Sequence, residues 1–462
     1  MEQFVDRRVE LNHLTDCYES AAAELAVIYG RRRLGKTELV TQSIADREGV
    51  VFYQAREKTK TLQLDQFASV AAEPFPGIER IQQEWEPLLG YLAEQDAIVV
   101  LDEFPYLIAE DESLPSVLQA MFDYGLDDSA ATFVLVGSSI SMMEEAALLG
   151  NSPLYGRATA TLDVHQLPFS AAMELLGEPD EPVDGIRYWG VFGGTPYYLN
   201  AAADADTLGE AVFETVLTQH GRLHDDPDYV LRMELTEPSR YFSILEAIAG
   251  GATTRNEIAG TVGIDANQLS RYLDRLERLR LVERHVPITE DKERSRRGRY
   301  RLLDPLFRFW FRFVYDSGTR YDAIGPESFD QLIEPELADF VSPVFERLCQ
   351  NALRELYPDE TITDVGQWWY QDSEIDVVGL TTDETLIVGE CKFQQSPLGY
   401  DALASLESHT EELRWTPPGG GERRCEYALF SRNGFKPSVK EAAAERADIR
   451  LIDPDELVAA LD

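Results

Sequence analysis

One segment near the N-terminus constrains this chain more than any other. Residues 30–37 read Gly-Arg-Arg-Arg-Leu-Gly-Lys-Thr, which is the G-x-x-x-x-G-K-[ST] pattern of a phosphate-binding loop. The apolar run Leu25–Tyr29 precedes the loop, and a helical pattern begins at Thr37. A strand, a glycine-rich loop and a helix in this order let backbone N–H groups and the helix N-terminus surround phosphates. The segment therefore predicts a nucleotide site in an α/β domain.

Two side chains of the loop have separate roles in this chemistry. Lys36 is expected to reach the β- and γ-phosphates of ATP, and Thr37 is expected to ligate Mg²⁺. ATP and Mg²⁺ are therefore the expected ligands. The loop residues that we expect at the nucleotide are Gly30, Arg31, Arg32, Arg33, Leu34, Gly35, Lys36, Thr37 and Glu38.

A second apolar run, Ile98–Leu101, ends in the carboxylates Asp102 and Glu103. Asp102 is expected to hold the water shell of the Mg²⁺ ion, and Glu103 to polarise the attacking water. The run follows the phosphate loop by about sixty-five residues. We therefore expect the two strands to lie side by side, with both ends at the carboxyl edge of one parallel sheet.

Two later features extend this site. The strand pattern Thr132–Val136 leads into Gly-Ser-Ser, where Ser138 or Ser139 can sense the γ-phosphate, although the tripeptide also suits a plain turn. Arg157 comes just before a further strand, Ala160–Leu162. It could reach the γ-phosphate of a neighbouring subunit, or it could be an ordinary surface arginine.

The charge of the chain is strongly acidic. Asp and Glu number 83 against 42 Lys and Arg, which gives a net charge of −41, and only seven of the basic residues are lysines. Salt near molar concentration shortens the Debye length to about 3 Å and makes such a charge tolerable. We interpret the composition as that of a halophilic archaeon. A nucleic-acid site would then have to be a local basic patch.

The sequence also indicates where the chain resides. Its apolar runs are too short to span a bilayer, and its first residues lack the pattern of a signal peptide. We therefore expect a cytoplasmic protein without a membrane partner. The four cysteines are scattered and form no paired spacing, which argues against a disulfide framework and a zinc site.

Residues 240–315 have the outline of a winged helix-turn-helix. Three short helical patterns precede two strand-like pieces around a charged hairpin: Tyr241–Ala249, Thr254–Thr261 and Asp265–Leu279. Two capping boxes are expected to start the second and third helices, Thr254 with Glu257 and Asp265 with Gln268.

The winged-helix pattern carries a basic cluster that favours contact with DNA. Docking to a protein, or a lid-like role, remains the alternative. The residues that we expect at DNA are Gln268, Arg271, Arg275, Arg294, Arg296, Arg297 and Arg299.

The last part of the chain has its own acidic constellation. Asp376 and Glu390 lie on neighbouring strand patterns and could bind a divalent cation, with Glu346 of a preceding helix completing the site. Lys392 falls on the same strand face as Glu390 and could orient water. The arrangement is similar to the PD-(D/E)XK nuclease fold, although the proline usual before the first acidic residue is missing: Glu374 and Ile375 precede Asp376. A degenerate fold that binds or assembles is the alternative.

The motifs of the first half occur in an order that resembles the archaeal AAA+ ATPase family related to STAND-type ATPases. The matching segments are Phe-Val-Asp-Arg at 4–7, the phosphate loop, Leu-Asp-Glu-Phe-Pro at 101–105, Gly-Ser-Ser-Ile-Ser-Met at 137–142, Ser-Pro-Leu-Tyr-Gly-Arg at 152–157 and Phe-Gly-Gly-Thr-Pro-Tyr-Tyr at 192–198. The resemblance implies ATP hydrolysis by a core able to form a homo-oligomer. It also implies that Asp6 and Arg7 lie near the adenine pocket, and that the C-terminal domain is nuclease-like.

These features predict an α/β multidomain chain. The expected domains are a P-loop AAA+ core (1–168), a helical lid (169–236), a winged helix-turn-helix (237–320) and a restriction-endonuclease-like domain (325–462). The expected function is ATP hydrolysis coupled to DNA binding or processing. One alternative is a slow ATP-dependent switch that binds a protein partner and carries an inactive nuclease fold. A toxin–antitoxin or defence role is a third, for which only the pairing of ATPase and nuclease patterns speaks.

Overall fold

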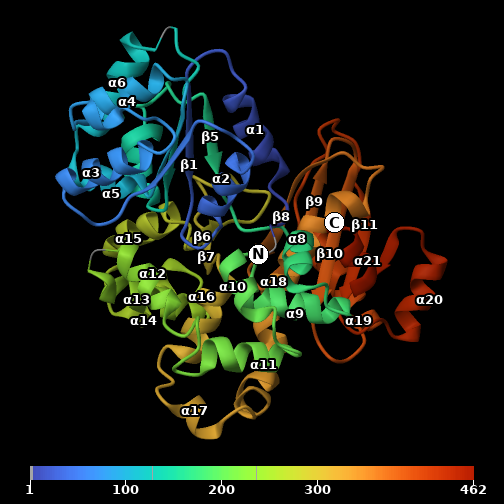
Figure 1. Cartoon of the computed structure of the whole chain (residues 1–462). Helices are drawn as coiled ribbons and strands as arrows, with labels where there is room; N and C mark the ends of the chain where they lie inside the picture. The colour runs from blue at the N-terminus through green and yellow to red at the C-terminus, as the bar shows by residue number, and fades with distance from the viewer. Residues whose placement is uncertain (1–3, 127, 236, 462) are drawn as a thin grey trace. The chain divides into compact units, whose positions relative to one another are not determined.

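The computed structural model describes residues 4–126, 128–235 and 237–461. The chain forms two compact units, Met1–Leu167 and Pro168–Asp462, which Figure 1 colours from blue to cyan and from green to red. Within the described residues, no helix combines the length and the apolar character that crossing a membrane requires. The four-domain division drawn from the sequence is finer than these two units and stays a prediction.

The first unit is built on a five-stranded sheet whose paired strands are all parallel. Its strands are β1 (Glu24–Tyr29), β2 (Val50–Gln54), β3 (Ile98–Asp102), β4 (Thr132–Gly137) and β5 (Ala160–Asp163). The strands predicted from the apolar runs are thus confirmed, each within a residue or two.

The order of these strands corrects one expectation. The sheet runs β2-β3-β4-β1-β5, so β4 lies between the strand that leads into the phosphate loop and the strand that ends in Asp102. The prediction that β1 and β3 lie side by side is therefore wrong. Strand neighbours are chosen by the packing of the crossover helices, which the spacing of motifs along the chain does not encode. Both strands still end at the same carboxyl edge.

Helices cover both faces of this sheet (Figure 1). Along β1, Leu25 and Val27 pack into one core, and Ala26 and Ile28 pack into the other, because successive strand residues point to opposite faces. The helical elements are α1 (Arg8–Tyr18), α2 (Lys36–Ile44), α3 (Lys60–Ala71), η1 (Ile78–Arg80), α4 (Trp85–Ala93), α5 (Phe104–Glu110), α6 (Leu114–Tyr124), α7 (Ile140–Met143) and η2 (Glu144–Leu148).

The second unit begins with a helical region and a two-stranded hairpin. The helical elements before the hairpin are α8 (Phe169–Leu176), α9 (Pro182–Phe192), α10 (Pro196–Ala202), α11 (Leu208–Val212), η3 (Phe213–Leu217), α12 (Asp226–Glu234), α13 (Pro238–Ala249), α14 (Arg255–Val262) and α15 (Ala266–Arg278). Strands β6 (Val282–His285) and β7 (Arg299–Leu302) then pair antiparallel. Three helices followed by a hairpin is the order that the sequence predicted for residues 240–315.

The two predicted capping boxes have different outcomes. Thr254 accepts a hydrogen bond from the N–H of Glu257, whose carboxylate accepts one from the N–H of Thr254, so the first box is confirmed. Asp265 stands at the N-cap of α15 without a side-chain capping bond, so the second box is wrong. Spacing allows a box, but the side-chain rotamer decides whether it closes.

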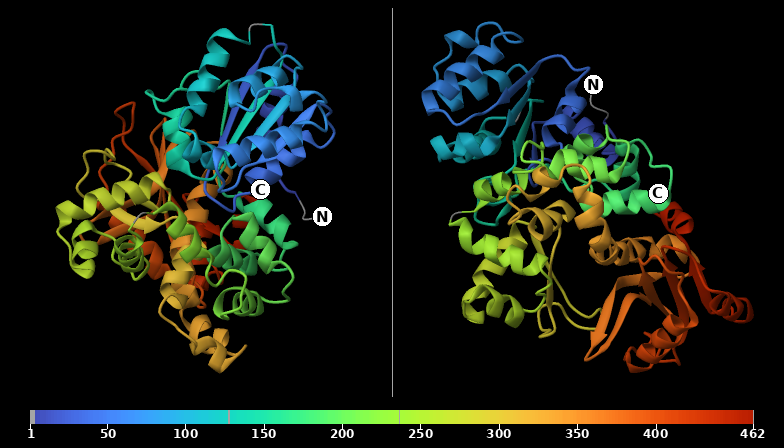
Figure 2. Two further views of the ribbon diagram at one scale, coloured as in Figure 1. Left: turned by 60° about the vertical axis from the view of Figure 1, so that its left-hand side comes forward. Right: turned by 90° about the horizontal axis from the view of Figure 1, so that it is seen from below.

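A second sheet closes the unit. Its order is β12-β11-β10-β9-β8, with β8, β9 and β10 antiparallel and β10, β11 and β12 parallel. Figure 2 shows these strands in orange and red in two further views. The remaining elements are α16 (Pro305–Phe309), η4 (Trp310–Val314), α17 (Arg320–Ile324), η5 (Phe329–Ile333), α18 (Glu334–Leu356), β8 (Ile362–Tyr370), β9 (Ser373–Thr381), β10 (Thr385–Lys392), α19 (Tyr400–Glu412), β11 (Arg424–Ser431), α20 (Pro437–Glu445), β12 (Ile449–Ile452) and α21 (Pro454–Ala459). In chain order, α18 precedes three strands, and α19 and α20 then each precede one further strand.

Candidate active site

The phosphate loop depends on two glycines for its shape. Gly30 has φ 150°, and a Cβ atom there would lie 2.4 Å from the carbonyl oxygen of Val164. Gly35 has φ 81° and forms the N-cap of α2. A side chain at Gly30 would collide with backbone, so the loop can wind closely between β1 and α2 only with glycine.

Lys36 is the first residue of α2, and its ammonium group turns back over the loop. The side chain is 5% exposed, and its Nζ donates hydrogen bonds to Gly30 O at 2.9 Å and Arg31 O at 2.7 Å. These carbonyls hold the charge in the concave side of the loop. A phosphate that entered the loop would therefore meet a positioned cation.

Thr37 and Asp102 come together across the intervening strand β4. The Thr37 hydroxyl donates to Asp102 Oδ2 at 2.9 Å. Gln54 of β2 donates to the same oxygen at 3.0 Å, and the Glu103 N–H donates to Asp102 Oδ1 at 2.9 Å. Three donors thus orient a carboxylate that is only 2% exposed. A hydroxyl beside an oriented carboxylate is a donor set of the kind that Mg²⁺ accepts, so these residues fit the ion.

Glu103 sits in a backbone conformation that few residues with side chains adopt. Its φ of 53° places it in the left-handed region at the N-cap of α5. The Ser138 hydroxyl donates to Glu103 Oε1 at 3.3 Å, and Arg32 Nη1 lies 3.5 Å from the same oxygen. Strain of this kind persists where surrounding contacts enforce it, and it clusters at functional sites.

One buried atom of this cluster has an unmet need. Arg32 Nε is buried and, in the part of the chain that the structure describes, has no hydrogen-bond partner. A guanidinium group beside the phosphate loop with an unmet donor fits an anionic ligand.

Ser139, the other sensor candidate, is the N-cap residue of α7.

Asp6 and Arg7 also lie near the carboxyl edge. Both have left-handed backbones, with φ 59° and 66°. Arg7 Nη2 donates to the carbonyl oxygen of His165, just after β5, at 2.5 Å, and Nη1 pairs with Glu10 at 3.1 Å. The buried Arg7 therefore fixes the start of α1 against the strand edge that carries the loop. No adenine contact follows from this geometry, and that role stays a prediction.

Arg157 is separated from these residues. It precedes β5, and the neighbouring Thr159 N–H bonds to Leu25 O at the start of β1, so Arg157 lies at the amino edge of the sheet. It forms a two-pronged ion pair with Asp123, with both N–O distances at 2.8 Å. The structure therefore brings Lys36 and Glu103 to one edge and leaves Arg157 at the other. A role toward its own loop is not supported by this placement.

The predicted DNA contacts fall into two groups. On α15, Leu269, Leu273 and Leu276 are buried as the pattern predicts, while Gln268 and Arg271 are exposed. Arg275 is partly buried, and on the hairpin Arg294 and Arg296 are exposed.

Arg297 and Arg299 are instead held by protein groups. Arg297 Nη1 donates to Trp369 O at 2.9 Å, and Arg299 Nη1 pairs with Glu374 at 2.7 Å. The Arg299 guanidinium also stacks over the Trp369 ring at 4.5 Å. These two arginines connect the hairpin to the second sheet. The basic pattern of the sequence did not indicate these contacts.

The predicted acidic constellation is assembled from α18, β9 and β10. Burial, followed by the charge of Glu374, raises the pKa of Glu346 to about 7. Burial, followed by the charges of Glu346 and Glu390, raises the pKa of Asp376 well above its usual value. Lys392 forms an ion pair with Glu390. The four side chains therefore share one electrostatic environment, as the strand pattern predicts.

This acidic centre does not present a ready set of metal ligands. Among the described residues, no group of three or more His, Cys, Asp and Glu side chains is placed to hold a metal ion. The Lys392 ammonium neutralises Glu390, and Asp376 Oδ2 accepts the N–H of Cys391 at 2.9 Å. The metal-binding role of Glu346, Asp376 and Glu390 therefore stays a prediction.

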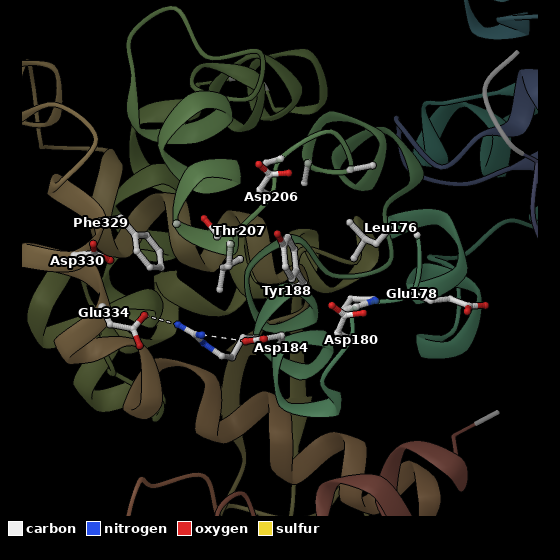
Figure 3. Close-up of a pocket in the computed structure, with 18 residues that line it drawn as sticks. Leu176, Glu178, Asp180, Asp184, Tyr188, Asp206, Thr207, Phe329, Asp330 and Glu334 are labelled. Atoms are coloured by element: carbon white, nitrogen blue, oxygen red, sulfur yellow. Dashed lines mark hydrogen bonds and ion pairs between the residues drawn. The ribbon is translucent and has the colours of Figure 1, made fainter.

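A hollow that the sequence did not predict lies among α8, α9, α11 and η5 (Figure 3). It encloses about 790 Å³, and Tyr188 and Phe329 form part of its wall. Arg187 bridges Asp184 and Glu334 across it. Its carboxylates come from five separate elements and loops, so no local pattern could have indicated it. They are Glu178, Asp180, Asp184, Asp206, Asp330 and Glu334.

Residues 4–202 match a family described as an ATPase domain predominantly from Archaea. An uncharacterized protein of Methanocaldococcus jannaschii is 33% identical over 386 residues, which cover 82% of this chain and 85% of that protein. The chain belongs to this archaeal ATPase family. Residues 310–407 of this ATPase match a second family, described as archaeal and bacterial proteins of unknown function. That match includes the acidic centre of α18, β9 and β10.

A solved structure supports the fold of the archaeal ATPase. The Walker-type ATPase of Pyrococcus abyssi aligns with a TM-score of 0.53 and 19% identity, over 68% of this chain and 97% of that one. The ORC2 protein of Aeropyrum pernix, solved as ADPNP–ADP complexes, aligns with a TM-score of 0.46 and 17% identity, over 70% and 98%. The family match and the alignment with the Pyrococcus abyssi ATPase confirm the expected P-loop ATPase core at the level of fold and family.

Sequence reasoning missed one residue beside the phosphate loop and left the role of another unspecified. Gln54 ends β2 and helps to orient Asp102, and Arg32 contacts Glu103. Gln54 could have been found from the sequence, because it is a polar residue that ends an otherwise apolar strand. The same kind of pattern pointed to Ser138. Arg32 was included only as part of the loop, because three consecutive arginines look alike in sequence.

Proposed function

We propose that this archaeal ATPase binds ATP with Mg²⁺ at the carboxyl edge of the first sheet and hydrolyses it. The observation that carries the proposal is the 2.9 Å contact between the Thr37 hydroxyl and Asp102, beside the ammonium group of Lys36. A structural glycine turn has no need for a hydroxyl, an oriented carboxylate and a buried cation at one point.

The side chains divide the work. Lys36 binds the β- and γ-phosphates, and Thr37 and Asp102 hold the Mg²⁺ ion, which when bound neutralises charge on the phosphate oxygens. Glu103 orients the attacking water and accepts its proton, while Ser138 orients Glu103 through the 3.3 Å contact. Arg32 offers its unmet N–H to a phosphate oxygen.

The test is the ATP turnover of Lys36→Ala in the full chain. Turnover should fall to background, because the positioned cation that binds the transferred phosphate is gone. Lys440→Ala is the matched control, since Lys440 is an exposed lysine of α20 in the other unit. Full turnover in Lys36→Ala would place the hydrolytic site elsewhere.

We further propose that the second unit binds DNA and that the nucleotide state of the ATPase regulates this binding. The exposed Gln268 and Arg271 of α15, with Arg294 and Arg296 of the hairpin, support it in a chain whose net charge is −41. ATP turnover measured with and without DNA from 0.1 to 1 M KCl tests the coupling. A rate that DNA leaves unchanged at every salt concentration would favour a switch that binds a protein partner.

Cleavage of DNA at the acidic centre is a separate hypothesis that the same preparation can test. Plasmid is incubated with Mg²⁺ or Mn²⁺, using wild type, Asp376→Ala and Lys392→Ala. Cleavage by wild type that both variants lose would establish a nuclease. Intact plasmid with every variant would overturn the nuclease hypothesis and leave the proposed DNA binding to be tested by itself.

A further inference from the structure

A second hollow in the C-terminal unit lies between the hairpin and the second sheet. It encloses about 730 Å³ and is bounded by β6 and the segment after it, Arg301 of β7, residues 347–354 of α18 and residues 364–367 of β8. The Ile288 N–H bonds to Gln367 O at 2.8 Å and joins the hairpin to β8 at its rim. We call it the hairpin pocket. Its volume is that of an ordinary ligand site.

The hairpin pocket reverses the charge of the chain. Three acidic side chains line it, whereas the chain as a whole has 83 acidic against 42 basic residues. Five basic side chains line it: Arg284, Lys292, Arg301, Arg347 and Arg354. A concave surface with this local excess concentrates anions, and the acidic remainder of the chain makes the contrast sharper.

The ion pairs among these side chains leave a net positive charge in the pocket. Arg301 and Arg347 both bind a single carboxylate oxygen of Glu283, at 3.1 and 2.7 Å. Arg354 donates hydrogen bonds to two backbone carbonyls, Ile362 O and Thr363 O, both at 3.3 Å. One carboxylate between two guanidinium groups neutralises one of them at most. An anion in the pocket would complete the balance.

A polar atom of the wall is also unsatisfied. His285 lines the pocket, and its Nδ1 is buried without a hydrogen-bond partner among the residues that the structure describes. Its ring meets Trp369 edge-on, with the centroids 5.3 Å apart, which fixes its orientation. A buried ring nitrogen of this kind costs free energy unless a ligand or water meets it.

The spacing along α18 shows how the cations are presented. Arg347, Asn351 and Arg354 recur at intervals of four and three residues, so they share one face of the helix. On the adjoining face, Gln350 donates to Asp376 O at 2.7 Å, and the pocket residue Gln367 donates to Glu346 at 2.8 Å. The basic wall therefore directly adjoins the acidic centre.

We propose that the hairpin pocket seats phosphodiester groups of a DNA strand. The inference rests on the proposed DNA binding of this unit. It places the main contacts to the DNA phosphates in the hairpin pocket, because Arg297 and Arg299 already bind groups of the second sheet. The point charge of Lys292 and the forked guanidinium donors of Arg301, Arg347 and Arg354 suit successive phosphates. Bound there, the strand passes beside the acidic centre.

The experiment measures binding of a fluorescent duplex, and of its single strand, to the full-length ATPase from 0.1 to 1 M KCl. The variant is Lys292→Gln with Arg354→Gln, because both residues are exposed and their removal leaves the Glu283 pairs intact. The control is Arg320→Gln with Lys440→Gln, which removes one exposed arginine and one exposed lysine away from the pocket. ATP turnover and melting temperature show that each variant is folded.

A phosphate contact contributes about 0.9 to the slope of log affinity against log salt for duplex DNA. Loss of two contacts should therefore make that slope less steep by about 2 and should weaken the affinity at 0.1 M KCl by about 60-fold. The control should match wild type. A pocket variant with the slope and affinity of wild type would overturn the inference while DNA binding stands. A wild type that binds neither DNA at any salt concentration would overturn the proposed DNA binding itself.

Discussion

Replacement of Glu103 by glutamine is expected to separate binding of ATP from its hydrolysis. Glutamine has the size of glutamate, so the left-handed N-cap position with φ 53° and the contact to Ser138 can both persist. What disappears is the negative charge and the ability to accept a proton from water. The loss falls on the chemical step alone.

The structure allows the competing effects to be weighed. The ion pair of Glu103 with Arg32 is long, at 3.5 Å, and such pairs contribute about 1 kcal/mol or less. A positioned general base contributes about 10²- to 10⁴-fold to rate, or about 3 to 5 kcal/mol of activation free energy. The catalytic effect therefore dominates. We expect kcat to fall at least 100-fold, with Kd for ATP within about threefold of wild type and an unchanged melting temperature.

The assay combines steady-state phosphate release with equilibrium binding of a fluorescent ATP analogue. Glu110→Gln is the matched control, because Glu110 is an exposed glutamate at the end of the same helix, α5. If Glu103→Gln kept more than about a tenth of the wild-type rate, Glu103 would not be the water-activating residue. A parallel loss of ATP binding would instead show that the substitution disturbs the loop.

Three further substitutions test other parts of the structure. Gly30→Ala should abolish binding of the ATP analogue and destabilise by more than about 1 kcal/mol, because its Cβ would stand 2.4 Å from Val164 O; retained binding would contradict the loop geometry. Thr254→Ala should cost about 1 kcal/mol in urea unfolding and Asp265→Ala less than about half of that, since only Thr254 caps its helix; equal costs would refute the assignment. Burial, then the nearby arginine of β7, lowers the pKa of His285 to about 3, so below pH 6.5 the unfolded chain takes up a proton that the folded chain does not. Stability from His285 should thus fall by about 2 kcal/mol between pH 6.5 and 5, and His285→Gln should remove this decline. The same decline in His285→Gln would show that His285 is not its source.

Local patterns predicted the elements that surround the phosphate loop. Buried strands reveal themselves as short apolar runs, so β1, β3 and β4 were placed within one or two residues. Lys36, Thr37 and Asp102 follow from motifs in which each residue type has one chemical task. The Thr254 capping box was predictable for the same reason, because its contacts span only three residues.

The sequence by itself determined the strands of the first sheet and the phosphate loop, because these depend on residues near one another in the chain. Only the tertiary structure decided which strands are neighbours, and it inserted β4 between β1 and β3. It also placed Arg157 at the amino edge of the sheet. Arg297 and Arg299, which were predicted to contact DNA, connect the hairpin to the second sheet through Trp369 and Glu374. A charged side chain can form an ion pair or hydrogen bond with any group that folding brings close to it, however distant that group is in the sequence. Spacing cannot say which group that is, and the hairpin pocket exists only because α18, β8 and the hairpin meet.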